Sequence, residues 1–177
     1  MDPHLRAELE RHHRDAYGWA LACCAHDPDL AEDVLQTTYL KVLEGKARYD
    51  GRAAFRTWLF AVIRNTAIDA LRRRRTRRLS LRRLALRQPP DAHVLPEDDA
   101  ALGHEEAERF RALLKRLPAR QREVLHLVFY HDLTIAEAAR VMGVGLGSAR
   151  THYERGKQRL RQWLTPNEHE PERRSAP

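Results

Sequence analysis

The hydrophobic residues of this chain recur at the spacing of an α-helix along most of its length. Two such stripes lie in the first half, Leu35, Tyr39, Val42 and Leu43, then Phe55, Trp58, Leu59 and Val62. The first stripe follows the segment HDPDLAED, which is typical of a helix start. No run alternates hydrophobic and polar residues in the manner of a β-strand. The pattern predicts an all-α protein.

The helical pattern is interrupted once, between roughly residues 76 and 104. The segment QPPDAHVLPEDD in this interval contains three prolines and four acidic residues, a composition typical of a linker. Helical stripes resume after it, with Leu113, Leu114 and Leu117 before Pro118, then Val124, Leu127 and Val128. We therefore expect two small helical domains, residues 1–78 and 105–164, joined by a flexible linker over 79–104. A disordered tail is expected over 165–177.

The second domain contains a pattern typical of a helix-turn-helix. Thr134 and Glu137 have the spacing of a capping box, so a helix is expected to begin at Thr134. Gly143 ends it with a tight turn, and a second helix begins near Gly147. That helix is expected to bury Ala149, Tyr153, Gly156, Leu160 and Leu164. Its outward residues would be Ser148, Arg150, Thr151 and Arg155. The basic outward face favours DNA binding over a generic helical hairpin.

Charge is concentrated in one part of the chain, whose net charge is +7 over 177 residues. Residues 51–90 contain 12 basic side chains and one acidic side chain, whereas residues 1–50 contain 6 basic and 10 acidic ones. Clustered basic charge is typical of a nucleic-acid-binding surface. The single acid, Asp69, lies four residues before Arg73, and we expect an ion pair within the helix.

Several functional classes are disfavoured by what the sequence contains. No apolar run has the length of a membrane-spanning helix and the N-terminus is charged, so we expect a cytoplasmic protein without membrane insertion. Cys23 and Cys24 are adjacent and would point about 100° apart on a helix, which favours buried thiols over a metal site. Asp69 alone in the basic block offers no catalytic constellation. We expect no enzymatic activity, no catalytic residues and no cofactor.

Two long segments resemble conserved regions of bacterial sigma factors. AEDVLQTTYLKVLEGKARYDGRAAFRTWLFAVIRNTAIDALRRRR resembles their second region, and LPARQREVLHLVFYHDLTIAEAARVMGVGLGSARTHYERGKQRLR resembles their fourth. Their order and spacing resemble the extracytoplasmic-function (ECF) subfamily. The resemblance implies a dissociable subunit that binds core RNA polymerase, directs it to promoter DNA and helps to open the duplex. It also implies an anti-sigma partner. The alternative is a stand-alone helix-turn-helix regulator that binds duplex DNA as a dimer.

The resemblance implies that the first domain binds the melted minus-ten element. Tyr49 would line a pocket for an extruded base, and Asn65 would contact the same element through its amide. The remaining residues expected to bind this element are Trp58, Arg64, Arg72, Arg73, Arg74 and Arg75, the arginine run holding phosphates. From the pattern alone, Trp58 is also expected to lie partly in the core. Asn65 has the alternative of satisfying a backbone group.

The resemblance places two further surfaces on the chain. Asp33 and Gln36 would share the helix face that binds core polymerase, where Thr37 replaces an acid usual in the family. Ser148, Arg150, Thr151 and Arg155 would face the major groove of the minus-thirty-five element. Glu154 would lie close to that DNA, where it either accepts a hydrogen bond from cytosine or pairs with a neighbouring arginine, and we favour pairing.

Overall fold

The computed structural model describes residues 3–84 and 112–164. Within these ranges the regular elements are all helices, which confirms the predicted all-α fold. They are α1 (Pro3–Arg11), α2 (His13–Cys23), α3 (Pro28–Leu43), α4 (Phe55–Leu84), α6 (Ala119–His131), α7 (Ile135–Met142) and α8 (Leu146–Leu164). A short helical stretch at 112–116 precedes α6. None of the described helices is both long enough and apolar enough to cross a membrane.

Residues 3–84 form the first body, in which α2, α3 and α4 pack against one another. The largest buried side chains include Trp19 from α2 and Leu59, Phe60 and Ile63 from α4. The indole Nε1 of Trp19 donates a hydrogen bond to the Phe60 carbonyl at 3.0 Å, so the bulkiest core residue is also satisfied as a donor. The predicted stripe is only partly right: Phe55 and Leu59 are buried, but Trp58 and Val62 are half-buried. Phe60 and Ile63, which lie outside the stripe, complete the core-facing side of α4.

The start of α3 is set by Asp27, as the segment HDPDLAED predicts. Its Oδ1 accepts a hydrogen bond from the Leu30 amide at 3.1 Å, and Pro28 occupies the first helical position. Such a cap satisfies one of the amides left unpaired at a helix start.

Residues 112–164 form the second body, which contains the predicted helix-turn-helix. Thr134 Oγ1 accepts from the Glu137 amide at 3.2 Å, while the Glu137 carboxylate accepts from the Thr134 amide at 2.9 Å. This is the predicted capping box. Gly143 ends α7 with a φ of 63°, in the left-handed region that favours glycine. The chain re-enters a helix three residues later, at Leu146.

The inner face of α8 matches the prediction with one exception. Ala149, Gly156 and Leu160 are buried and Tyr153 is half-buried, but Leu164 is 46% exposed. Leu164 is the last residue of α8. Its neighbour Trp163 makes a cation–π contact near this end, with its ring centroid 4.7 Å from the Arg116 guanidinium carbon.

Helix α4 is longer than the predicted first domain. It continues to Leu84, through residues 79–84 that the sequence pattern assigns to the linker. Arginine and leucine dominate this stretch, both are strong helix formers, and no glycine or proline interrupts the chain before Pro89. The rest of the predicted linker, 85–104, and the predicted tail, 165–177, lie outside the described residues.

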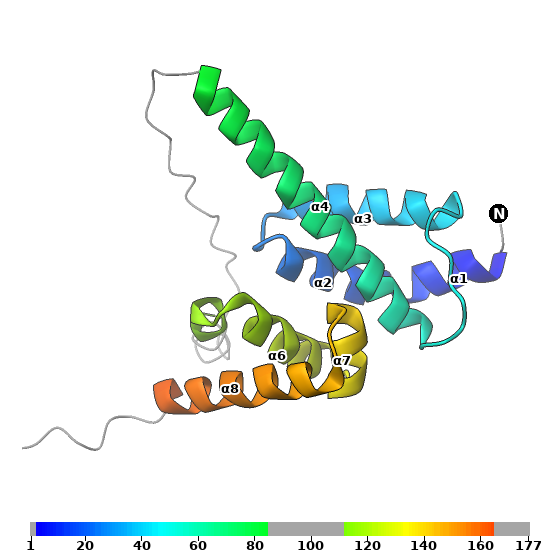
Figure 1. Ribbon diagram of the computed structural model, residues 1–177. Coiled ribbons are helices and arrows are strands. Elements are labelled where there is room, and N and C mark those ends of the chain that lie inside the picture. The colour runs from blue at the N-terminus through cyan, green and yellow to red at the C-terminus, as the bar shows by residue number, and fades with distance from the viewer. Residues whose placement is uncertain (1–2, 85–111, 165–177) are drawn as a thin grey trace, which may run out of the picture.

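The two bodies pack against each other, which the sequence did not indicate. Helix α7 packs on α4, and Figure 1 shows α6, α7 and α8 lying along the side of the first body formed by α2 and α4. We call this packing the closed arrangement. It places part of the predicted DNA-binding surface between the two bodies.

Candidate nucleic-acid interface

The loop before α4 presents an aromatic ring at the surface. Tyr49 is 41% exposed, and its hydroxyl donates a 2.6 Å hydrogen bond to the Ala53 carbonyl. Its ring centroid lies 5.3 Å from the rings of both Phe55 and Trp58. The hydroxyl bond and the ring contacts hold the ring in place while leaving one side open, as a stacking platform requires. Trp58 is half-buried in this cluster, in agreement with its expected place partly in the core.

Arg64 and Asn65 are consecutive in α4, and both were predicted to contact DNA, but their side chains point in different directions. Asn65 is exposed, so its amide is available for recognition of a base edge. Arg64 is only 9% exposed, and its guanidinium forms a two-point ion pair with the Glu123 carboxylate of α6. Because neighbouring helical residues point about 100° apart, the two cannot share one face. In the closed arrangement Arg64 therefore holds the second body and does not face DNA.

The arginine run in the second half of α4 divides between two faces of the helix. Arg74 pairs with Asp27 at 2.6 Å, and Arg73 lines a groove against α3. Arg72 and Arg75 are exposed, and neither forms an ion pair with the residues that the structure describes. The expected pair between Asp69 and Arg73 is likewise not among the ion pairs of the described residues. Arg72 and Arg75 are thus the members of the run available to phosphates.

The predicted polymerase face of α3 lies beside this basic part of α4. Asp33 and Gln36 are exposed and line a groove of about 600 Å³ between α3 and α4, together with Arg73 and Arg77. Sequence reasoning assigned the arginines to DNA and the acidic helix to a protein partner. The structure brings them together into one surface of mixed charge.

The second helix of the helix-turn-helix presents all four predicted side chains to solvent. They are Ser148, Arg150, Thr151 and Arg155. Thr151 Oγ1 donates to the Gly147 carbonyl at 3.0 Å, which leaves its lone pairs and methyl group for a partner. Glu154 pairs with Lys157 at 3.6 Å, and the ion pairs of the described residues include none between Glu154 and an arginine, so its role close to DNA stays a prediction. The i, i+3 spacing brings that lysine onto the same side of α8.

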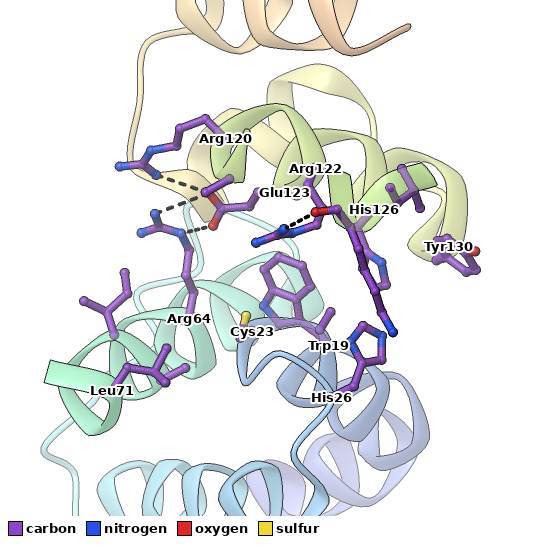
Figure 2. Close-up of a pocket in the computed structure, with 16 residues that line it drawn as sticks. Trp19, Cys23, His26, Arg64, Leu71, Arg120, Arg122, Glu123, His126 and Tyr130 are labelled. Atoms are coloured by element: carbon purple, nitrogen blue, oxygen red, sulfur yellow. Dashed lines mark hydrogen bonds and ion pairs between the residues drawn. The ribbon is translucent and has the colours of Figure 1, made fainter. Parts of the chain in front are cut away.

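A cleft of about 350 Å³ separates parts of the two bodies, and Figure 2 shows the side chains around it. Deeper in the contact, the Phe60 and His131 rings lie 4.8 Å apart, and those of Trp19 and His126 5.7 Å. Burial lowers the pKa of His126 to about 3, helped by His131, His26 and Arg122, and burial lowers the pKa of His131 to about 4. Both imidazoles therefore act as neutral aromatic packing groups near neutral pH.

These contacts between the bodies were missed by sequence reasoning. Arg64 and Glu123 are 59 residues apart, and no local pattern pairs them. The one available signal was Glu123 itself, an acid in the predominantly basic segment 119–164.

Comparison with known proteins identifies relatives for both bodies. The family model Sigma-70 region 2 matches residues 9–77, and the model Sigma-70, region 4 matches residues 107–160. The ECF RNA polymerase sigma factor SigX of Bacillus subtilis is 30% identical over 167 residues, covering 93% of this chain and 85% of SigX. The ECF RNA polymerase sigma factor SigC of Mycobacterium tuberculosis is 30% identical over 142 residues, covering 80% and 74%.

Two solved structures share the fold. The sigma factor RpoE, in its complex with the anti-sigma factor NepR from Bartonella quintana, superposes with a TM-score of 0.66 at 23% identity, covering 90% of this chain and 95% of RpoE. CnrH, in complex with the cytosolic domain of CnrY, gives a TM-score of 0.59 at 24% identity, covering 90% and 86%.

Proposed function

The chain belongs to the ECF family of RNA polymerase sigma factors, and we propose which of its surfaces carries out each step of initiation. As a sigma factor it is a non-enzymatic subunit that binds core RNA polymerase, directs it to promoters and promotes DNA opening. The first body recognises the minus-ten element, the second recognises the minus-thirty-five element, and α3 with the end of α4 docks on the polymerase.

We assign recognition of the minus-thirty-five element to α8, and the exposure of its predicted contact residues is the observation that carries the proposal. Its four predicted contact residues are all exposed on the second helix of a capped helix-turn-helix. A helix of this kind fits the major groove, where an arginine can donate two hydrogen bonds to guanine. Arg150 and Arg155 provide that chemistry, and Ser148 and Thr151 add shorter hydroxyl contacts.

Opening of the minus-ten element rests on the edge formed by the Tyr49 loop and α4. Removing a base from the duplex stack costs a few kcal/mol, and stacking on an aromatic ring returns about 1–3 kcal/mol. The held ring of Tyr49 offers such a surface without first having to be ordered. Asn65 is exposed for base recognition, while Arg72 and Arg75 attract phosphates without sequence preference.

Docking on core polymerase rests on the groove between α3 and α4. Asp33 and Gln36 supply an acidic and an amide group, and Arg73 adds a cation on the opposite wall. Such a surface of mixed charge fits a partner helix that presents both signs of charge. An anti-sigma partner and a cytoplasmic location complete the proposal. The complex of the similar RpoE with an anti-sigma factor supports the partner. The location is supported by the function itself, because a sigma factor has to reach RNA polymerase and promoter DNA.

Run-off transcription with core polymerase tests the function as a whole. Adding the chain should produce promoter-specific transcripts that core enzyme alone does not make. The double variant Asp33→Ala/Gln36→Ala should abolish them together with co-purification of core enzyme, while helical circular dichroism stays unchanged. If the chain instead footprints duplex DNA as a dimer and transcript levels are the same without it, the protein is a stand-alone regulator.

The role of Tyr49 is tested by comparing two substitutions. Tyr49→Ala should reduce open-complex formation by about 1–3 kcal/mol, the stacking free energy of one base. Tyr49→Phe keeps the ring and removes only the hydrogen bond to Ala53, so it should retain most of the activity. Permanganate reactivity of unpaired thymines measures opening, with a premelted template as control. Normal opening by Tyr49→Ala would make Tyr49 a packing residue.

A further inference from the structure

The cleft between the two bodies is built largely from apolar side chains. One wall comes from α2 and α4 and includes Trp19, Ala67 and Leu71, and the other comes from the second body and includes Leu114 and Tyr130. Figure 2 shows these two walls facing each other across the cleft. Its volume of about 350 Å³ falls within the range of roughly 300–1,000 Å³ that small-molecule sites occupy.

The charged groups around the cleft are mostly cationic. Arg64, Arg120, Arg122 and Lys115 line it, against the single carboxylate of Glu123. That carboxylate already accepts from both Arg64 and Arg120. One guanidinium nitrogen of Arg122 donates to the Lys115 carbonyl at 3.2 Å, which uses only part of its donor capacity. The Lys115 ammonium is exposed and pairs with no acid of the described residues. Among the residues that the structure describes, the uncompensated charge of the lining is therefore positive.

From this combination we infer that the cleft is a binding site for a small amphipathic anion, with an apolar body and one acidic head group. The apolar body would be buried between the Leu71 and Leu114 walls, which returns free energy in proportion to the area removed from water. The head group would meet the Lys115 ammonium and the Arg122 guanidinium in charge-assisted hydrogen bonds. A neutral apolar molecule could not form the charge-assisted hydrogen bonds. A polyphosphate has no apolar body to bury between the walls.

Occupancy of this site couples to the arrangement of the two bodies. The walls belong to different bodies, so the complete site exists only in the closed arrangement. A ligand that binds one arrangement and not the other raises its population by mass action. We therefore expect such an anion to hold Arg64 and α4 against the second body and to lower transcription. This consequence rests on the proposed function, whereas the binding itself does not.

Titration calorimetry with decanoate tests the binding, with decanol as the uncharged counterpart and both below micelle-forming concentrations. The intact parent chain should bind decanoate. Its affinity for decanol should be lower by about tenfold or more, because decanol cannot form the charge-assisted contact. Lys115→Glu and Leu71→Asp should each weaken decanoate by at least the same factor. Equal affinity for decanol and decanoate overturns the inference, as does the absence of any decanoate binding.

Two control residues of the first body lie outside the lining of the cleft. Leu43→Asp changes a leucine of similar exposure, 42% against 39% for Leu71, and Lys46→Glu changes an exposed lysine. Both should bind decanoate as the parent does. If they weaken binding as much as the cleft variants, decanoate binds elsewhere and the assignment is wrong. Circular dichroism checks folding. If Leu71→Asp does not fold, Lys115→Glu and the decanol comparison still decide.

Run-off transcription separates the site from its consequence. Decanoate should lower transcripts made with the parent chain and have at least about tenfold less potency with Lys115→Glu, in line with the weakened binding. Binding without any effect on transcription would refute the coupling and leave the binding site standing. A chain that binds decanoate but never supports transcription would refute the proposed function alone.

Discussion

Gly156 lies at the closest approach of α8 to α6. A Cβ at this position would lie 2.8 Å from Leu125 Cδ1 and 3.3 Å from Gln121 Cβ, and Leu125 is fully buried. Gly156→Ala should therefore force the two helices apart and destabilise the second body by about 1–3 kcal/mol. A urea titration followed by circular dichroism measures this free energy of unfolding.

Gly147 provides the matched control in the same helix. A Cβ there meets no atom within 4 Å, so Gly147→Ala should be neutral or stabilise by up to about 1 kcal/mol. Similar losses in the two variants would show that steric contact at Gly156 is not what requires glycine.

The two buried histidines make stability depend on pH. Their ordinary pKa is 6.5, and in the folded chain burial lowers it to about 3 for His126 and about 4 for His131. Below pH 6.5 the unfolded chain takes up protons that the folded chain does not, so the free energy of unfolding falls as the pH is lowered. The loss should continue until the folded pKa values are reached and should total roughly a few kcal/mol.

Denaturation curves between pH 7 and 4.5 measure this dependence. His126→Gln should flatten it, because the folded chain then no longer holds this imidazole neutral. The same dependence in parent and His126→Gln would show that His126 is not held neutral by the fold.

At the scale of single elements, α4 separates two functions by helical phase. Arg72 and Arg75, at i and i+3, share an exposed face, whereas Arg74 is held by Asp27 and Arg73 lines the α3 groove. Arg72→Gln/Arg75→Gln should weaken binding to all DNA sequences. It should lower the slope of log affinity against log salt by roughly one to two units, at about 0.7–0.9 per phosphate contact.

Arg74→Gln is the control for this prediction. It removes a partly exposed ion pair worth about 0–1 kcal/mol of stability and should leave the salt slope unchanged. Filter binding over a range of salt concentrations gives both slopes. A larger slope change from Arg74→Gln than from the double variant would reverse the assignment of faces.

The elements themselves were accessible from sequence because their determinants are local. The helix start in HDPDLAED, the capping box at Thr134 and the glycine at 143 each depend on residues within a few positions, and the structure confirms all three. The length of α4 was underestimated because a charged, arginine-rich stretch lost its apolar period while keeping high helix propensity. The residues of α8 that face outward followed from the same periodicity.

At the scale of the whole molecule, the contact between the bodies depends on residues distant in sequence. Arg64 was expected at DNA and is instead buried against Glu123, and nothing within either segment signals this pairing. The burial of His126 and His131 has the same origin. Such contacts depend on how the two folded bodies pack against each other, and the hydrophobic periodicity of a single helix does not encode this packing.

The Arg64–Glu123 pair offers a direct test of the closed arrangement. Breaking a buried pair by changing one partner leaves an uncompensated charge and costs about 3–5 kcal/mol, so Glu123→Arg should separate the bodies. The reversed pair Arg64→Glu/Glu123→Arg should restore much of the contact. Small-angle scattering reports the separation as a larger radius of gyration. An unchanged radius for Glu123→Arg would show that apolar packing alone holds the bodies together.

The position of Cys23 makes the reactivity of its thiol depend on whether the two bodies are in contact. Its sulfur lies in the cleft beside Glu123, and burial, followed by the charge of Glu123, raises the pKa of the thiol well above its usual value. Alkylating reagents react with the thiolate, so the closed arrangement slows them and separation of the bodies accelerates them. Cys24, buried in the core of the first body, stays silent. The rate of carbamidomethylation of Cys23 therefore reports how often the two bodies separate in the unlabelled protein, and it can be measured in the presence of polymerase or promoter DNA.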